Sequence, residues 1–290
     1  STVGELKPEE SPSDFHDTWD LDGTDFTPEA SPDDEGYWDD FENIVLNHNY
    51  EELGDNIVTN GTFDSDANWT KVDSWSISGG KAVCDGSQSS NAELKQQNGV
   101  AGVTLNIING KTYQLTFDLV VQAGGITSVE VGGTSDLNTI SSSGTYTRTL
   151  TASSTNKRIT FAANPTFEGS LDNVTLKQVD PNDRWVLGTG WSIEDGKAIG
   201  TSTTNNLQQL SILTAGDTYE LTFTISDYSA GSVRANVGGV HGTLRSSNGT
   251  FTQIIGPATS PHFFFDGVST FTGKIDNVIV KEYAIKPLDV

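Results

Sequence analysis

The chain has 290 residues and a formal net charge of −23, with 39 acidic residues against 16 basic ones. This balance argues against binding the phosphates of DNA or RNA and against adsorption to an anionic membrane surface. The single cysteine, Cys84, excludes an internal disulfide, and no apolar run approaches the length of a membrane span. The length suits two ordinary domains.

Residues 1–54 differ in composition from the rest of the chain. They hold 17 acidic residues and a single basic one, Lys7, with seven aromatic residues interleaved among the carboxylates. A solvated, disordered tail is one interpretation of such charge. The aromatic content favours another, an extended acidic arm that docks on a basic, grooved surface of a partner. The predicted docking residues are Phe15, Trp19, Phe26, Tyr37, Trp38 and Phe41.

From residue 55 onward, short apolar runs alternate with residues typical of turns, which predicts strands rather than helices. Residues 113–119 place Tyr, Leu, Phe and Leu at every second position, and residues 219–225 repeat this pattern. Such alternation predicts a half-buried strand with one face turned inward. Gly110 and Gly216 precede these strands at equivalent positions, as expected of turns.

Similar blocks occur twice in the same order, which predicts two copies of one domain. Trp69 and Trp75 are six residues apart, as are Trp185 and Trp191, and Ser-Ile-x-x-Gly-Lys-Ala follows the second Trp of each pair. The strands and turns between them predict an all-β chain of two tandem β-sandwiches. We expect the acidic arm at residues 1–54, the sandwiches at 55–180 and 181–283, and a C-terminal tail at 284–290.

The segment Asn56-Ile-Val-Thr-Asn-Gly-Thr-Phe-Asp64, the Trp pairs, Gly-Gly-Lys-Ala and the terminal Asp-Asn-Val resemble carbohydrate-binding-module-like jelly-roll domains. These sequence motifs also resemble those of structural proteins of tailed bacteriophages, marine ones especially. The resemblance covers residues 55–180 well. It covers residues 181–283 less completely, because they lack the Asn-Gly-x-Phe-Asp opening. It implies a jelly-roll fold but does not specify a ligand, since one sandwich hosts many functions.

The resemblance also implies a structural Ca²⁺ that ties the first strand of a sandwich to its last. The matching positions are Asn60, Asp64 and Asp172, whose side-chain oxygens suit this cation. The alternative is that Asn60-Gly61 forms a turn and Asp172 caps the end of a strand. The second repeat retains Asp276 without the opening partners, which makes a cation less expected there.

A sugar site would need an exposed aromatic platform flanked by polar groups. The four repeated tryptophans are predicted to lie in the core instead, because they recur at equivalent positions of both domains. Phe263-Phe264-Phe265 is a different case, because alternation along a strand would turn at least one ring outward. A strand buried on both faces is the alternative. The sequence identifies no sugar-binding residue.

We therefore expect a non-enzymatic virion protein, present in several copies. The arm would dock on capsid or tail subunits, and the two sandwiches would project outward and decorate the particle or contact host glycans. Such a protein is made in the host cytoplasm and needs no nucleic acid, membrane insertion or cofactor other than Ca²⁺. A secreted carbohydrate-binding protein is the alternative. A glycan-cleaving enzyme is the least favoured, since nucleophile-elbow, phosphate-loop and zinc-protease motifs are missing.

Overall fold

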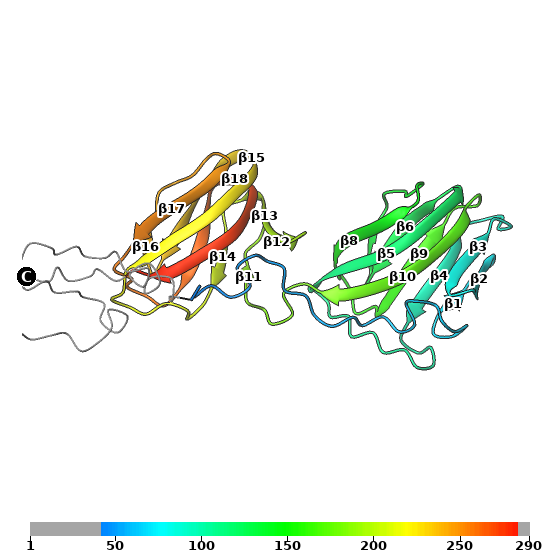
Figure 1. Ribbon diagram of the computed structural model, residues 1–290. Coiled ribbons are helices and arrows are strands. Elements are labelled where there is room, and N and C mark those ends of the chain that lie inside the picture. The colour runs from blue at the N-terminus through cyan, green and yellow to red at the C-terminus, as the bar shows by residue number, and fades with distance from the viewer. Residues whose placement is uncertain (1–41, 284–290) are drawn as a thin grey trace, which may run out of the picture.

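The computed structural model describes residues 42–283 and shows two β-sandwiches joined end to end (Figure 1). Within this range there is no helix, and thus none that could cross a membrane. Every pairing between two labelled strands is antiparallel, which confirms the predicted all-β sandwich class. The six predicted docking aromatics of the arm and the tail at 284–290 lie outside the described residues.

The first sandwich consists of two five-stranded sheets. Its β4 layer has the order β1-β4-β9-β6-β7, with bounds Thr70–Lys71, Ala92–Gln97, Arg158–Ala163, Ile126–Val131 and Thr134–Asp136. The facing sheet has the order β2-β3-β10-β5-β8, with bounds Trp75–Ser78, Lys81–Asp85, Glu168–Gln178, Thr112–Ala123 and Gly144–Thr151. Inward residues at every second position of β5 form the centre of one continuous core.

The second sandwich repeats this arrangement with two long strands that take part in both layers. β15 (Tyr219–Val237) pairs with β18 (Phe263–Glu282) from end to end, and both bend midway. Ser269 and Thr270, at the bend of β18, have positive φ angles of 53° and 62°. The shorter strands are β11 (Val186–Leu187), β12 (Trp191–Glu194), β13 (Lys197–Thr203), β14 (Asn206–Gln209), β16 (Val240–His241) and β17 (Gly249–Ile255).

One layer of the second sandwich, here the β14 layer, corresponds to the β4 layer of the first. It contains β11, β14, residues 263–267 of β18, residues 232–237 of β15, and β16. The side chains that it turns outward are described below as a candidate site.

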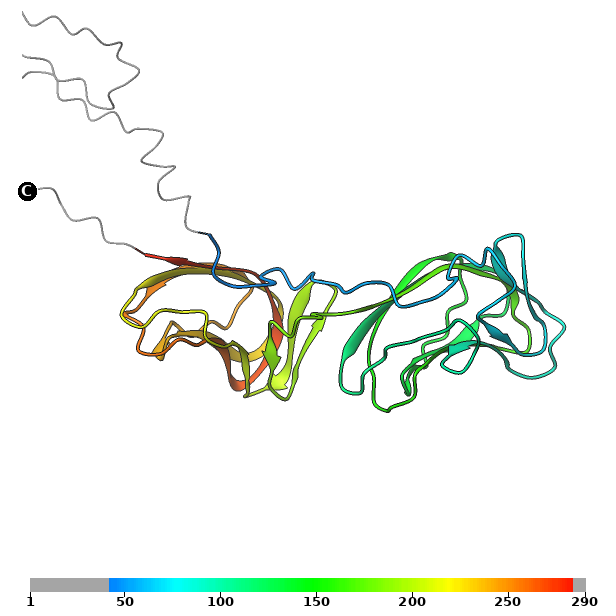
Figure 2. The ribbon, with the colours of Figure 1, turned by 90° about the horizontal axis from the view of Figure 1, so that it is seen from below.

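Residues 43–50 pack on the second sandwich although they precede the first one in the chain (Figure 2). Val45 and Tyr50 are 2% and 1% exposed, and the Tyr50 ring centroid lies 4.9 Å from that of Trp185. In the first sandwich, Phe63 contacts Trp69 in the same way, with 5.2 Å between the centroids. The sequence placed these residues in the arm because of the negative charge of residues 1–54. In the structure, Val45 and Tyr50 instead belong to the hydrophobic core of the second sandwich.

The hydrogen bonds of residues 43–50 match those of residues 56–63. Asn43 Oδ1 accepts the N–H of Val280 at 2.9 Å, and Asn56 Oδ1 accepts the N–H of Leu176 at 3.0 Å. In each case the asparagine ties the opening segment to the last strand of its sandwich. The opening that residues 181–283 lack is thus supplied by residues 43–50.

Two chain segments run antiparallel to each other in the connection between the sandwiches. Leu53 forms an isolated antiparallel bridge with Val179, and the Gly54 N–H donates to the Gln178 carbonyl at 2.8 Å. The Asp180 N–H donates to the carbonyl of Glu52 at 2.9 Å. The chain thus passes from the second sandwich to the first before residue 56 and returns after residue 178.

Candidate functional site

Phe264 lies in the middle of the outer face of the β14 layer. Its neighbours Phe263 and Phe265 are completely buried, whereas Phe264 is partly exposed. The reason is the two-residue period of a strand, which turns alternate side chains to opposite faces. One ring of the Phe-Phe-Phe run therefore points outward, which is one of the two outcomes that the sequence left open.

Polar side chains flank Phe264 on both neighbouring strands. Gln208 of β14 and Asn236 of β15 are its register partners, about 5 Å away on either side. Asn236 is only 3% exposed, and its Oδ1 accepts the N–H of Gly239 at 2.7 Å. His241 of β16 continues the row, with its Nδ1 at 3.0 Å from Asn236 Nδ2. The result is an aromatic ring between two amides, one of which is held in place.

A charged pair forms the next row of the same face. Asp266 is the register partner of Arg234, and its Oδ2 lies 3.3 Å from Arg234 Nε. The same oxygen lies 3.6 Å from His241 Nδ1. The carboxylate side chain is 16% exposed and the guanidinium side chain 31%, so the pair is half-buried but accessible. Groups of this kind form strong, directional hydrogen bonds with a polar ligand.

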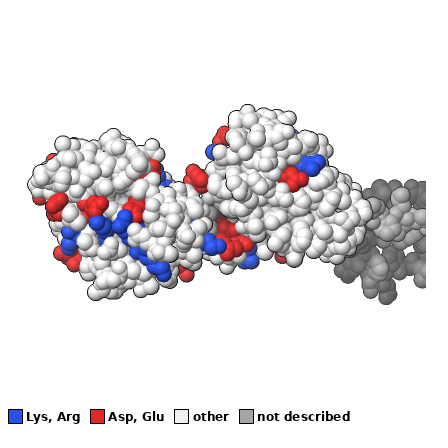
Figure 3. Space-filling view, turned by 180° about the vertical axis from the view of Figure 1, so that it is seen from behind, with Lys and Arg blue, Asp and Glu red and all other residues white. Residues whose placement is uncertain are grey.

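The equivalent face of the first sandwich has a different character. Thr160 occupies the central position, between Lys95 of β4 and Glu130 of β6. Arg158 donates to both carboxylate oxygens of Glu130, at 2.7 and 2.6 Å, and these bonds raise the pKa of the guanidinium. Figure 3 shows a band of charged side chains across the first sandwich. The aromatic platform is therefore a property of the second sandwich.

The candidate calcium residues make local contacts. Asn60 Nδ2 donates to the carbonyls of Ser65 and Ala67, at 2.7 and 3.0 Å. Asp64 Oδ2 accepts from the Thr62 hydroxyl at 2.7 Å, and Asp172 Oδ1 accepts the N–H of the following residue. Among residues 42–283 no group of three His, Cys, Asp or Glu side chains is placed to hold a metal. The cation stays a prediction.

The four repeated tryptophans lie in the two cores, as predicted. Trp69, Trp75, Trp185 and Trp191 are between 4% and 6% exposed. Three of the indole N–H groups donate to backbone carbonyls, and that of Trp75 has no partner among the described residues. These rings are therefore not available as a sugar platform.

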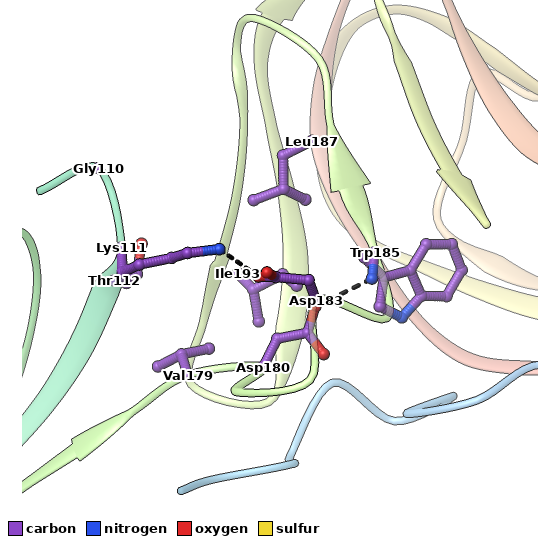
Figure 4. Close-up of a pocket in the computed structure, with 9 residues that line it drawn as sticks. All are labelled: Gly110, Lys111, Thr112, Val179, Asp180, Asp183, Trp185, Leu187 and Ile193. Atoms are coloured by element: carbon purple, nitrogen blue, oxygen red, sulfur yellow. Dashed lines mark hydrogen bonds and ion pairs between the residues drawn. The ribbon is translucent and has the colours of Figure 1, made fainter. Parts of the chain in front are cut away.

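A hollow of about 200 Å³ lies at the junction of the sandwiches (Figure 4). Lys111 of the first sandwich reaches across it to the carboxylate of Asp183. Asp180 accepts the backbone N–H of Trp185 at 2.9 Å, and the Trp185 ring points away from the hollow into the second core. Since an ion pair spans it and the Trp185 ring is turned toward the second core, the hollow suits a contact between domains better than a ligand site.

Comparisons with known proteins find similarity to solved structures but none to a protein family or a curated protein sequence. No protein family matches the sequence, and no curated protein matches it either. A tandem pair of N-terminal CBM22 domains from Paenibacillus barcinonensis is 10% identical, with a TM-score of 0.34, over 81% of this chain and 99% of that chain.

Two other solved structures are similar over most of this chain. An allantoicase is 9% identical, with a TM-score of 0.25, and the match covers 88% of this chain and 99% of the other. An anti-sigma factor domain-containing protein is 7% identical, with a TM-score of 0.21, over 77% and 87% of the two chains. Because these TM-scores are low, the assignment of two β-sandwiches rests on the strand pairing described above and not on these similarities.

Proposed function

We propose that the protein binds carbohydrate through the outer face of the β14 layer, with Phe264 as the platform. The observation that carries this proposal is the outward ring between two amides, one strand away on each side. The C–H face of a pyranose ring packs on an aromatic surface, and its hydroxyls need donors and acceptors at the rim. Gln208 and the Arg234–Asp266 pair provide both, while the buried Asn236 amide is already engaged by Gly239 and His241.

The role that we assign to this face is binding rather than catalysis. Asp266 is the only carboxylate in the two rows described, and its Oδ2 lies near Arg234 and His241. Hydrolysis of a glycosidic bond by the common mechanisms needs two carboxyl groups on either side of the bond. Turnover of any polysaccharide by the purified protein would contradict this assignment.

The test is Phe264→Ala, assayed against a panel of polysaccharides by affinity electrophoresis and calorimetry. We expect the variant to bind roughly 5- to 30-fold more weakly, since stacking on the outward ring contributes on the order of 1–2 kcal/mol. Thr160→Ala, at the equivalent position of the first sandwich, is the matched control and should bind as the parent does. Equal binding by both variants, or no binding by the parent, would refute the proposal.

We infer further that the setting of this binding protein is a tailed-phage virion. Support comes from the sequence resemblance and from the aromatic, acidic composition of residues 1–41. A chain that lacks residues 1–41 should lose most of its incorporation into particles, because the predicted docking residues are removed and the described sandwiches are kept. Incorporation is measured by quantitative mass spectrometry of purified particles. Equal incorporation of the shortened chain would favour a secreted protein instead.

A further inference from the structure

The strand β17 is a long free edge of the second sandwich. It pairs with β15 on one side and with no other strand in the described part of the chain (Figure 1). Its seven residues, Gly-Thr-Phe-Thr-Gln-Ile-Ile, carry no charge. The other edge strands of the two sandwiches, apart from β8, are only two to four residues long. A long, uncharged edge is a template on which another strand can add.

Every second residue of β17 directs its backbone N–H and C=O away from the sheet, because these groups alternate in direction along a strand. The Tyr283 N–H donates to the Thr218 carbonyl at 2.7 Å, so Thr218 faces β18. Tyr219 therefore faces β17, where its register partner is Ile255. The residues whose backbone groups point outward are then Thr250, Thr252 and Ile254. This edge thus presents three N–H and three C=O groups to a further strand.

The side chains of the same three residues lie exposed on the outer face of the sheet. The Thr252 hydroxyl lies 2.8 Å from that of Thr222 of β15, and the Thr250 hydroxyl lies 2.9 Å from that of Thr224. Ile254 is 52% exposed. A strand that adds to β17 would extend these rows of threonines, and it would cover part of the isoleucine side chain.

The equivalent edge of the first sandwich, β8, is protected by an arginine. Arg148 Nη1 donates at 2.9 Å to the Thr147 carbonyl, which points outward as its counterpart in β17 does. The Nε of the same guanidinium donates to Asp136 Oδ2 at 2.7 Å. In β17 the position of Arg148 is taken by Gln253, whose Oε1 accepts the Thr243 N–H at 3.0 Å. Charged residues on an edge strand oppose strand addition, and β17 lacks this protection.

We propose that β17 pairs antiparallel with β17 of a second copy of this chain, about a two-fold axis at Thr252. Thr252 then faces its own counterpart, and Thr250 of each copy faces Ile254 of the other, so that all the outward groups gain partners. The chain carries a net charge of −23, so two copies approach most easily where neither presents a charge. The proposed glycan face stays open, because β17 pairs with residues 219–225 of β15, outside the β14 layer.

The test is analytical ultracentrifugation of the full chain from micromolar to near-millimolar concentrations. A contact along one strand is small, so we expect a weak, reversible equilibrium between monomer and dimer. Thr252→Pro removes the central outward N–H and keeps the bonds to β15, so the dimer should be lost. Thr147→Pro, at the equivalent position of β8, is the matched control and should dimerise as the parent does.

Thr252→Lys is a second variant, should Thr252→Pro fail to fold. It places two ammonium groups opposite each other on the axis, so the dissociation constant should rise roughly tenfold or more, and high salt should reverse part of this rise. In the parent, hydrogen–deuterium exchange of β17, but not of β8, should slow as the concentration increases. A chain that stays monomeric throughout would overturn the proposal, as would a dimer that the Thr252 variants leave unchanged.

Discussion

Deletion of residues 1–53 should unfold the second sandwich and leave the first one folded. The deletion removes Tyr50 and Val45 from the second core, where both are almost fully buried. Loss of a buried aromatic side chain alone costs about 3–5 kcal/mol. A typical domain is stable by only about 5–15 kcal/mol, so the combined loss approaches or exceeds this margin.

Hydrogen bonds add to the cost of this deletion. Asn43 joins the segment to the last strand, accepting the Val280 N–H and donating to the Val278 carbonyl at 2.8 Å. Trp185 Nε1 donates to the carbonyl of Asn47 at 3.0 Å. Without the segment, these groups of the second sandwich lose partners that the first sandwich, with its own opening at 56–63, retains.

Hydrogen–deuterium exchange read by mass spectrometry checks this expectation. Peptides that cover β13 and β14 should exchange rapidly in the shortened chain, while those that cover β4 and β9 stay protected. Deletion of residues 1–41, which leaves the packed segment in place, is the matched control and should protect both sandwiches. Protection of β13 and β14 without residues 1–53 would show that the second sandwich closes by itself.

The strands and the tryptophan cores could be predicted from the sequence because the signals are local. Alternation over residues 113–119 and 219–225 fixes which side chains point inward, without knowledge of the partner strand. The outward ring of Phe264 follows from the same rule. The residues beside it do not, because Gln208, Asn236 and Asp266 reach it only through strand register, which depends on distant segments.

The place of residues 43–50 could have been found from the sequence. Asn43-Ile-Val-Leu-Asn47 matches Asn56-Ile-Val-Thr-Asn60, which begins 13 residues further along the chain, so the two openings stand in tandem. The sequence prediction missed this match for two reasons. It treated each repeat as one continuous segment, and it placed residues 43–50 in the arm because the residues around them are acidic. Neither composition nor repeat order shows which core a segment enters.

Gln209→Leu should destabilise the second sandwich, and Gln96→Leu the first, each by about 1–3 kcal/mol. Gln96 and Gln209 are at most 1% exposed. Gln209 Oε1 accepts the Leu46 N–H at 3.1 Å, and Gln96 Oε1 accepts the Thr59 N–H at 3.0 Å. Each amide also donates to the carbonyl of the same residue, so a leucine of similar size leaves both backbone groups without a partner.

Calorimetry of the parent chain and these variants measures this effect. Gln209→Leu and Gln96→Leu should each lower the Tm of one transition by roughly 5–10 °C and leave the other in place. Gln97→Leu, on the outer face of β4 next to Gln96, is the matched control and should shift neither transition by more than about 2 °C. If Gln209→Leu left both transitions unchanged, the bond to Leu46 would not hold the opening segment. Residues 43–50 would then depend on the burial of Val45 and Tyr50, and on the hydrogen bonds of Asn43 and Asn47, for their place in the second core.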